Sequence, residues 1–367
     1  MKNIAVFFGG QSVERDVSVI TGVLTLNSLD KEKFNAVPVY VHNDGRWYTG
    51  DSLFDVENYK TLDVKKLTPV TIKGGDNCLY KTKRNKLKKL FPISVGINCI
   101  HGERGEDGSL AGYLKMCDIP LSSPDLFCSS AFMDKEYTKI VLKGLKIKCL
   151  PSVTINNVND VFAVESKIEY PVIVKPATLG SSIGIKTAKN REDLIGAISY
   201  ALRYSDKAVV EQFVEDFIEI NCAVYMDRKG ICVSECEQPI KSADVLGFDD
   251  KYADGEKIFP ANVDKSVSDK IKKIAKKIYW GTGADGIIRI DFIVKDGDVF
   301  VNEVNTVPGS LSYYLFCDTM KEFSTLLSAV ICRAEQKYAK SKTVIRTFSS
   351  SVLNIKGIKG SKTLVKK

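Results

Sequence analysis

The chain is poor in histidine, in long apolar runs and in repeated sequence. No apolar run approaches the ~18 residues that a membrane-spanning helix needs, so no membrane association of that kind is expected. His42 and His101 are the only histidines, and Cys232 and Cys236 lack a second cysteine pair at suitable spacing, which argues against a zinc site. Internal repeats and low-complexity segments are absent before the basic end of the chain.

What is present is an ordinary globular composition. Of 367 residues, 44% are hydrophobic and 27% are charged, which excludes a disordered, collagenous or fibrous class. At roughly 100 to 200 residues per domain, this length indicates two or three domains. Ten cysteines are scattered among apolar neighbours, and the apolar run at the start, Ile4 to Phe8, is too short for a secretory leader. We therefore expect a reduced, cytoplasmic protein.

The net charge of +8 comes from the end of the chain. Residues 334–367 contain nine basic side chains and one acidic side chain, so the preceding 333 residues are neutral overall. A solvated basic tail explains this pattern, and contact with RNA or an anionic surface is the alternative. Because such a tail carries no sequence information, we expect no nucleic-acid partner.

Apolar periodicity indicates an α/β protein that opens with a Rossmann-like, parallel-sheet domain. Strand, helix and strand are predicted in that order over residues 4–8, 18–29 and 36–40. A small α+β unit follows, with a helix predicted over 131–145, and a second unit begins near residue 214. The expected divisions are an N-terminal domain with a polar, hairpin-like insertion, two α+β subdomains and a basic tail: 1–122 with the insertion at 42–90, 123–213, 214–340 and 341–367.

The most informative segment is a hairpin near the end of the globular part. A β-branched strand over 286–294 and a second strand over 299–305 flank Lys295-Asp-Gly-Asp298. A three-residue loop would place Asp291 opposite Glu303 and Arg289 opposite Asn305, all on one face. A two-residue Asp-Gly turn would split the four side chains between both faces and bury charge among isoleucine and valine. That cost favours the first register.

Two carboxylates and an amide oxygen on adjacent strands are hard ligands, which suit Mg²⁺ or Mn²⁺ better than zinc. Arg289 beside them would stabilise anionic oxygens. A hydrated sheet face with an Arg–Asp pair is the alternative. The tight turn Thr306-Val-Pro-Gly-Ser310 just beyond the cluster favours a site.

A second segment joins a lysine to a loop of small residues. The strand Val172 to Lys175 runs into Pro-Ala-Thr-Leu-Gly-Ser-Ser-Ile-Gly184, whose backbone N–H groups can approach phosphate oxygens. This is not a P-loop, because the lysine precedes the glycines, and a plain turn is the alternative. The stretch from Glu211 to Glu219 is compatible with either a nucleotide hinge or an edge strand.

Two further loops follow buried strands. Gly9-Gly-Gln-Ser-Val-Glu-Arg-Asp-Val-Ser18 lies where a helix N-terminus would attract anions, although Ser12 could simply be an N-cap. His101-Gly-Glu-Arg-Gly-Glu-Asp-Gly108 follows the strand over 93–100 at an equivalent strand end. A lone histidine is usually structural, but functional residues concentrate in such loops.

Together and in order, these segments resemble the D-alanine–D-alanine ligase family of the ATP-grasp superfamily, from about residue 4 to 318. The other motifs that carry the resemblance are Met133-Asp-Lys-Glu-Tyr-Thr-Lys139, Lys175-Pro with Gly180-Ser-Ser-Ile-Gly184, Asp250-Lys-Tyr252, Arg289-Ile-Asp291 and Asn302-Glu-Val-Asn-Thr-Val-Pro-Gly309. The resemblance implies a two-part ATP-grasp fold after the N-terminal domain. It also implies ATP-dependent ligation of two D-alanines, through an acyl phosphate, for peptidoglycan precursor synthesis.

The resemblance assigns roles by position. The residues implied to bind ATP are Lys135, Lys175, Gly180, Ser181, Ser182, Glu211, Val214, Glu219 and Lys251. Two Mg²⁺ or Mn²⁺ ions would be held by Asp291, Glu303 and Asn305. Residues implied to bind the amino-acid substrates are Glu14, His101, Arg289, Ser310, Tyr314 and Leu315. The implied catalytic residues are Glu14, Ser181 and Tyr252, which tie a lid to the site, and Arg289 with the Gly309 N–H, which stabilise an oxyanion.

One position departs from the family pattern. The family usually carries a serine and a leucine where this chain has Tyr314-Leu315. A D-amino acid acceptor is predicted, with D-alanine favoured, D-serine as the alternative and D-lactate less compatible with Lys251-Tyr252. Two competing hypotheses are that the chain ligates a different acid and amine, or that it is a nucleotide-binding protein that has lost its chemistry. The resemblance further implies a homodimer.

Overall fold

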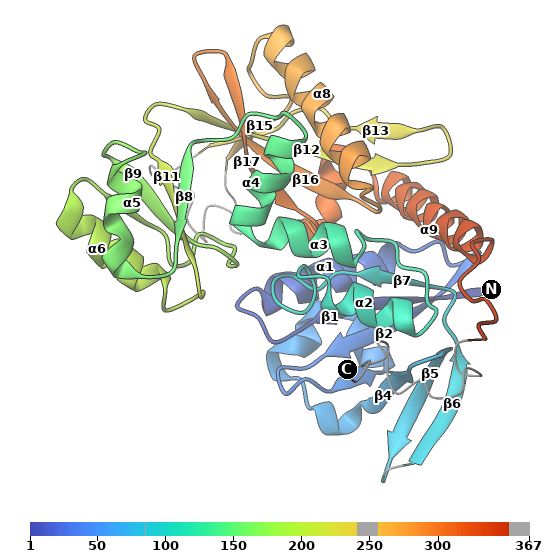
Figure 1. The fold of residues 1–367 in the computed structure, drawn as a ribbon. Coiled ribbons are helices and arrows are strands. Elements are labelled where there is room, and N and C mark those ends of the chain that lie inside the picture. Colours follow the sequence, from blue (N-terminus) through green and yellow to red (C-terminus); the bar gives the residue numbers. More distant parts are fainter. Residues whose placement is uncertain (85, 241–255, 352–367) are drawn as a thin grey trace.

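The computed structural model describes residues 1–84, 86–240 and 256–351. In Figure 1 the N-terminal sheet lies at the bottom, a small lobe made of residues 151–213 lies to one side, and the C-terminal sheet with α8 (Lys265–Thr282) lies above. The described residues form sheets of seven, four, four and two strands, so the predicted mixed α/β class is confirmed. None of the helices among them is long and apolar enough to cross a membrane.

The N-terminal sheet is built around a strand that is buried from Ile4 onward. β1 (Lys2–Gly9) pairs in parallel with β2 (Phe34–Val41) on one side and β7 (Val95–Asn98) on the other. Alternate residues of β1 enter two different cores: Ile4, Val6 and Phe8 face α1 (Arg15–Ser28) and α9 (Met320–Lys342), whereas Ala5 and Phe7 face α2 (Ser109–Met116). Burial on both faces explains the continuous apolar run of this strand.

The segment 42–90, expected as a hairpin-like insertion of irregular structure, extends this sheet. After three short 3₁₀ helices, β4, β5 and β6 continue it antiparallel, in the order β6-β5-β4-β3-β2-β1-β7. The elements are β3 (Trp47–Thr49), η1 (Asp51–Phe54), η2 (Val56–Thr61), η3 (Val64–Lys66), β4 (Thr68–Lys73), β5 (Asp76–Lys83) and β6 (Lys86–Pro92). The sheet is therefore parallel only at β2-β1-β7.

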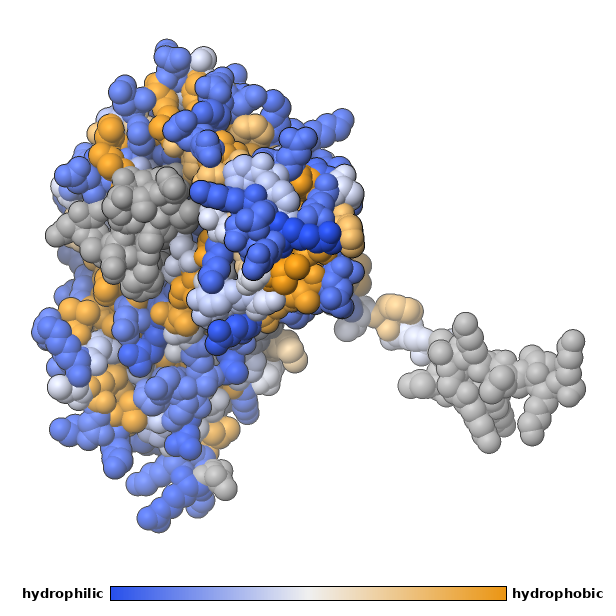
Figure 2. All heavy atoms as spheres, turned by 90° about the vertical axis from the view of Figure 1, so that its left-hand side faces the viewer, coloured by the Kyte–Doolittle hydropathy of each residue, from blue (hydrophilic) through white to orange (hydrophobic). Residues whose placement is uncertain are grey.

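Edge lysines conceal the strand pattern of this segment. β6 is an edge strand that exposes Lys86, Lys88 and Lys89, and charged side chains at an edge discourage pairing with other chains. The lower end of the molecule, where Figure 1 places this hairpin, is accordingly hydrophilic in Figure 2.

The central lobe is a four-stranded sheet with two helices on one face. Its strands lie in the order β10-β9-β11-β8, and α5 and α6 fill their core against it. The elements are β8 (Ser152–Ile155), η4 (Val158–Asp160), α5 (Val161–Glu165), β9 (Val172–Pro176), β10 (Lys186–Ala188), α6 (Arg191–Ala201) and β11 (Ala208–Gln212).

Two helices precede this lobe where a single helix over 131–145 was predicted. α3 (Leu126–Met133) ends at Asp134, which has φ −95° and ψ 118°, and α4 (Lys135–Gly144) begins directly after it. The Asp134 carboxylate accepts hydrogen bonds from the backbone N–H groups of Glu136 (2.8 Å) and Tyr137 (3.3 Å). The prediction of one helix is wrong because this aspartate is an N-cap.

The C-terminal sheet has the order β13-β12-β16-β17, and α8 covers its core face. Its strands are β12 (Ile218–Met226), β13 (Ile231–Val233), β16 (Ile288–Lys295) and β17 (Asp298–Asn305). A separate two-stranded sheet pairs β14 (Gln238–Pro239) with β15 (Lys257–Ile258). After η5 (Gly309–Leu315), α9 returns to the N-terminal sheet, where Phe323 and Leu327 are buried.

The β16/β17 hairpin combines both registers considered from the sequence. Its turn has two residues, Asp296 and Gly297, at φ 50° and 79°, so the predicted three-residue loop is wrong. The register shifts by one between Asp291 and Phe292, and Asp291 then opposes Glu303 while Arg289 opposes Asn305, as predicted. The physical reason is a bulge.

The bulge keeps two consecutive polar residues, Asn302 and Glu303, out of the core. Phe292 opposes Val301 and Asp291 opposes Glu303, so Asn302 has no partner in the ladder. Val301 and Val304 stay buried on either side, whereas Asn302 and Glu303 are partly exposed. Without the extra residue, one of these two side chains would face the core.

Candidate active site

A cavity lies between the central and C-terminal sheets. Its lining includes the apolar side chains of Phe213, Phe217 and Ile293 and the basic side chains of Lys135 and Lys175. Apolar walls with a few convergent polar groups are typical of a site for a small ligand. The same cavity is lined by eight of the nine residues assigned to ATP: Lys135, Lys175, Gly180, Ser181, Ser182, Glu211, Val214 and Glu219. The ninth, Lys251, lies outside the described residues.

Two lysines hold a buried carboxylate, Glu211, that lines this cavity. Lys175 Nζ donates to Glu211 Oε2 at 2.7 Å, and Lys139 Nζ lies 3.0 Å from Glu211 Oε1. Burial would raise the pKa of Glu211, but the two ammonium groups outweigh it and lower that pKa to about 2. Lys175 also donates to Asn302 Oδ1 at 3.2 Å, which links β9 to the bulge of β17.

The small-residue loop after β9 has a left-handed backbone at two consecutive serines. Ser181 and Ser182 have φ of 54° and 58°, in the left-handed region that non-glycine residues rarely adopt. Lys135 is attached to this loop twice, because its backbone N–H donates to Ala177 O at 2.9 Å and its Nζ donates to Leu179 O at 2.5 Å. The loop and Lys135 are therefore one unit.

The β16/β17 hairpin supplies a buried charge cluster. Arg289 binds both oxygens of Asp291, with Nε to Oδ1 at 2.7 Å and Nη2 to Oδ2 at 2.8 Å. Asn305 Nδ2 donates to Asp291 Oδ2 at 3.0 Å. Asp291 is 1% exposed, so this pairing is shielded from water.

The donor chemistry of this cluster fits a hard cation. Asp291, Glu303 and Asn305 offer carboxylate and amide oxygens, and a carboxylate that accepts from a guanidinium keeps further lone pairs for a metal. Glu303 lines the same cavity as Ser181 and Ser182. The part of the chain that the structure describes contains no group of three or more His, Cys, Asp or Glu able to hold a metal ion. The candidate set therefore depends on the asparagine as its third ligand.

The loop after β1 contacts the loop that contains Ser181. Glu14, which is 7% exposed, accepts a hydrogen bond at Oε1 from the Ser181 hydroxyl. A Cβ atom on Gly180 would lie only 3.2 Å from Glu14 Oε1, so a side chain there would disturb this contact. Two members of the predicted triad are thus in contact, and the third, Tyr252, lies outside the described residues.

His101, which is buried, and Glu106, which is partly exposed, line the same cavity as Glu14. His101 Nε2 is 3.0 Å from Thr21 Oγ1, and burial together with the nearby Arg289 charge lowers the pKa of His101 to about 4. Glu106 accepts from the backbone N–H of Gly102 (2.9 Å) and of Val307 (3.2 Å). Burial, with repulsion from Glu14, raises the pKa of Glu106 to about 8.

The segment after the hairpin has an unusual backbone. Ser310, Leu311 and Ser312 have φ of 50°, 50° and 49°, and each non-glycine residue in this region costs roughly 1–2 kcal/mol. The Ser310 N–H donates to Thr21 Oγ1 at 3.0 Å, so one threonine contacts both this turn and His101. Strained backbone of this kind concentrates at functional sites.

Tyr314 lines a further cavity, which also contains Glu14 and Arg289. Lys257 Nζ is 4.3 Å from the centre of the Tyr314 ring and 3.2 Å from Glu237 Oε1. Burial raises the pKa of Tyr314, which keeps its hydroxyl protonated as a hydrogen-bond donor. The assigned substrate residues that line this cavity are Glu14, His101, Arg289, Ser310 and Tyr314, together with Gly309. Leu315 is buried and is not part of its lining.

Several residues that shape the site received no role from the sequence. Lys139 and Asn302 hold the Glu211–Lys175 pair, and Thr21 supports His101. Glu106 lay inside a recognised motif, so its position was available as a signal. Lys257 carried none, because its contact with Tyr314 joins segments that are distant in the sequence.

Comparison with known proteins agrees with this geometry. A family model described as D-ala D-ala ligase N-terminus matches residues 3–124, and one described as D-ala D-ala ligase C-terminus matches residues 149–332. A D-alanine–D-alanine ligase from Thermosipho melanesiensis is 36% identical, and the match covers 97% of this chain and 99% of that protein. One from Proteus mirabilis is 32% identical, with coverage of 94% and 98%.

Solved structures lead to the same result. The D-alanine–D-alanine ligase of Helicobacter pylori superposes with a TM-score of 0.75 at 29% identity and covers 90% of this chain and 98% of its own. The D-Ala:D-Ser ligase of Enterococcus faecalis gives a TM-score of 0.79 at 28% identity, with coverage of 91% and 99%. The predicted ATP-grasp fold class is confirmed, and the chain belongs to the D-alanine–D-alanine ligase family.

Proposed function

We propose that the chain joins two D-alanines to D-alanyl-D-alanine at the expense of ATP, for peptidoglycan precursor synthesis. The observation that supports this most is a continuous set of cavities. The first cavity shares Lys135, Ser181 and Glu303 with a second one, which in turn shares Glu14 and Arg289 with the cavity that reaches Tyr314. A nucleotide at one end and two amino acids at the other would therefore meet at Glu303 and Arg289.

The first step makes an acyl phosphate. Lys135, Lys175 and the 180–182 loop would hold the ATP phosphates, and Glu14 would hold the ammonium group of the first D-alanine. The carboxylate of this D-alanine attacks the γ-phosphate, and ADP leaves. Asp291, Glu303 and Asn305 would hold Mg²⁺ or Mn²⁺, which would neutralise phosphate charge when bound.

The second step forms the peptide bond. The amine of the second D-alanine attacks the acyl phosphate carbon, and phosphate leaves through a tetrahedral intermediate. Arg289 and the Gly309 N–H would stabilise its oxyanion. His101 has a pKa of about 4 and is therefore neutral at neutral pH, so it contributes no positive charge to the first substrate. Lys251 and Tyr252 remain proposed lid residues that exclude water.

The acceptor is proposed to be D-alanine, with D-serine as the second candidate. Tyr314 stands where the family usually has a serine, and a chain that acts as a D-Ala:D-Ser ligase is among the structural relatives. The Tyr314 hydroxyl and Lys257 would both favour an acceptor carboxylate. A homodimer is proposed from the family resemblance. A cytoplasmic location is supported by the ten cysteines, which are all free thiols.

The test is ATP-dependent phosphate release with Mg²⁺, with products identified by mass. D-Alanine alone should give its dipeptide, and L-alanine is the matched negative control. Release only when D-serine is added would transfer the assignment to a D-Ala:D-Ser ligase. Absence of release with D-alanine, D-serine and D-lactate would overturn the proposal.

A further inference from the structure

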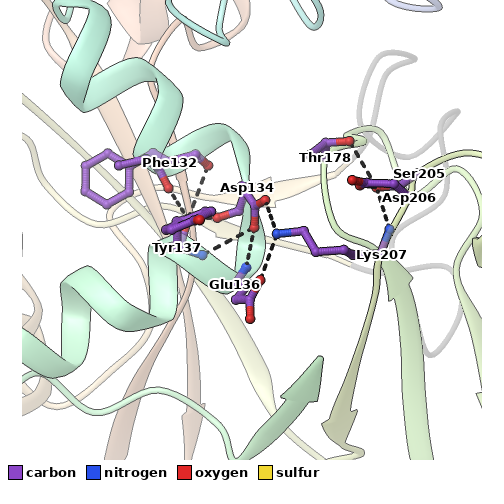
Figure 3. Close-up of polar contacts among 10 residues, drawn as sticks. Phe132, Asp134, Glu136, Tyr137, Thr178, Ser205, Asp206 and Lys207 are labelled. Atoms are coloured by element: carbon purple, nitrogen blue, oxygen red, sulfur yellow. Dashed lines mark hydrogen bonds and ion pairs between the residues drawn. The ribbon is translucent and has the colours of Figure 1, made fainter. Parts of the chain in front are cut away.

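Lys207 was assigned no role in the site, but it connects the start of α4 with the loop after β9, and both of these carry assigned site residues. Lys207 directly precedes β11 in the central lobe, and Asp134 and Glu136 lie at the start of α4. Its Nζ is 2.7 Å from Asp134 Oδ2 and 2.7 Å from Glu136 Oε2. Figure 3 shows the side chain of Lys207 extending to the two carboxylates, with Tyr137 beside them.

These contacts are stronger than those of an ordinary surface ion pair. The Lys207 side chain is 22% exposed and that of Asp134 is 12% exposed, so water screens the pair poorly. Lys207 Nζ also lies 4.9 Å from the centre of the Tyr137 ring. Hydrogen bonds to two carboxylates outweigh partial burial and raise the pKa of Lys207, which stays charged at every physiological pH.

Asp134 transmits this contact to Lys135. One carboxylate oxygen of Asp134 caps the first turn of α4 and the other accepts from Lys207. Lys135 is the first residue of that helix. Lys207 therefore restrains the turn from which the Lys135 side chain extends.

The backbone of Lys207 also restrains the loop over 176–184, which is proposed to hold the ATP phosphates and is called the phosphate loop below. Its carbonyl oxygen accepts from Ala177 N–H at 3.0 Å, and the Ala177 carbonyl accepts from Lys135 N–H at 2.9 Å. Thr178 Oγ1 and Ser205 Oγ, 3.2 Å apart, add a second link nearby. A closed ring of contacts thus runs from Lys207 through Asp134, Lys135 and Ala177 back to Lys207.

We propose that Lys207 is a positioning residue for ATP, which fixes Lys135 relative to the phosphate loop without touching the nucleotide. The proposal rests on the proposed function in one respect, namely that Lys135 and the loop hold ATP phosphates. Small displacements of such groups weaken binding steeply. The cavity that reaches Tyr314 contains no member of the ring, so amino-acid binding there should be unaffected.

The test measures ATP affinity directly, by calorimetry with Mg²⁺ and no D-alanine, alongside steady-state kinetics. Lys207→Met, which keeps the length of the side chain and removes its charge, should raise the Kd and KM for ATP by about tenfold and leave the KM for D-alanine within about twofold. Lys207→Arg should restore most of the affinity, since a guanidinium can bind both carboxylates. Lys148→Met is the matched control, because Lys148 pairs with Asp298 at 2.9 Å at the far hairpin turn.

Three results would overturn the proposal: an unchanged ATP affinity in Lys207→Met, an equal loss in Lys148→Met, or no recovery in Lys207→Arg. If Lys207→Met does not fold, Glu136→Gln removes one of the two carboxylates and should weaken ATP binding by about threefold. An unchanged Kd in that variant would likewise refute the role. A protein that binds ATP but forms no dipeptide would contradict the proposed function and leave this test intact.

Discussion

Replacing Glu211 by glutamine tests the charge balance of the cavity that is proposed to bind ATP. Glu211 is 2% exposed and lies between the ammonium groups of Lys175 and Lys139. Glutamine keeps the shape of the side chain and removes its negative charge. Two positive charges then remain close together in a site with little water, where they repel each other and lose their common partner.

The magnitude follows from the pKa of the carboxyl group. One pKa unit is worth about 1.4 kcal/mol, so lowering the pKa of Glu211 from 4.5 to about 2 corresponds to about 3 kcal/mol of stability at neutral pH. Breaking a buried ion pair by removing one partner typically costs about 3–5 kcal/mol, which agrees. We expect Glu211→Gln to lose about 3 kcal/mol and to bind ATP more weakly, because Lys175 loses its anchor.

The sign of the pH dependence is fixed by the same shift. A carboxyl whose pKa is lower in the folded protein stabilises the fold above its unfolded pKa of 4.5, and this contribution is lost as pH falls toward about 2. The difference in stability between wild type and Glu211→Gln should therefore be constant near neutral pH and shrink on acidification below about pH 4.5.

Urea unfolding followed by circular dichroism, at several pH values, measures this difference. Glu165→Gln in the same lobe is the matched control, because Glu165 makes partly exposed contacts with Tyr170 and Arg191 and should cost less than about 1 kcal/mol. A loss below about 1 kcal/mol in Glu211→Gln, or a difference that grows as the pH falls, would refute the reasoning.

Three further predictions concern the rest of the site. Asp291→Asn should abolish turnover and, by leaving Arg289, whose side chain is only 17% exposed, without its carboxylate, should cost about 3–5 kcal/mol of stability in urea unfolding. Tyr314→Phe should raise the KM for the acceptor about tenfold and leave the KM for ATP unchanged, as read from initial rates, because only the hydroxyl is lost. Because burial raises the pKa of Glu106 to about 8, stability should fall as pH rises from about 4.5 to about 8, and thermal unfolding of Glu106→Gln should show a flatter dependence.

Each of these predictions has a contrary outcome. Dipeptide formation by Asp291→Asn at the wild-type rate would remove Asp291 from the proposed metal site. An acceptor KM unchanged by Tyr314→Phe would show that the hydroxyl does not contact the acceptor. If the stability of the wild type relative to Glu106→Gln rises from pH 5 to pH 8, the pKa of Glu106 is not raised in the folded protein.

The fold class could be predicted because buried strands appear in the sequence as continuous apolar or β-branched runs. The apolar run of β1 is buried on both faces, and the β-branched run of β16 lies in the middle of its sheet. Local rules failed where a polar residue decides the backbone: Asp134 interrupts a continuous helical pattern by capping α4. They also failed for β6, where edge lysines mask the alternation that reveals a half-buried strand.

The β16/β17 hairpin shows which features could be predicted from the local sequence and which could not. The cost of burying charge correctly predicted that Asp291 opposes Glu303, although the three-residue turn from which that pairing was derived is wrong. The same argument could not locate the bulge, because a two-residue turn followed by one extra residue satisfies the same burial constraint. The choice between them depends on the packing of Val301 and Val304 against α3 and α8.

The sequence by itself determined the family to which the motifs belong, and it predicted which loops could approach phosphate and which oxygens would suit a hard cation. Only the tertiary structure decided the partners. Glu211 lies between two lysines from different elements, Lys207 joins α4 to the phosphate loop, and Lys257 lies over Tyr314. The reason is physical, since short-range periodicity records burial and turns, whereas these contacts depend on how separate sheets pack against each other.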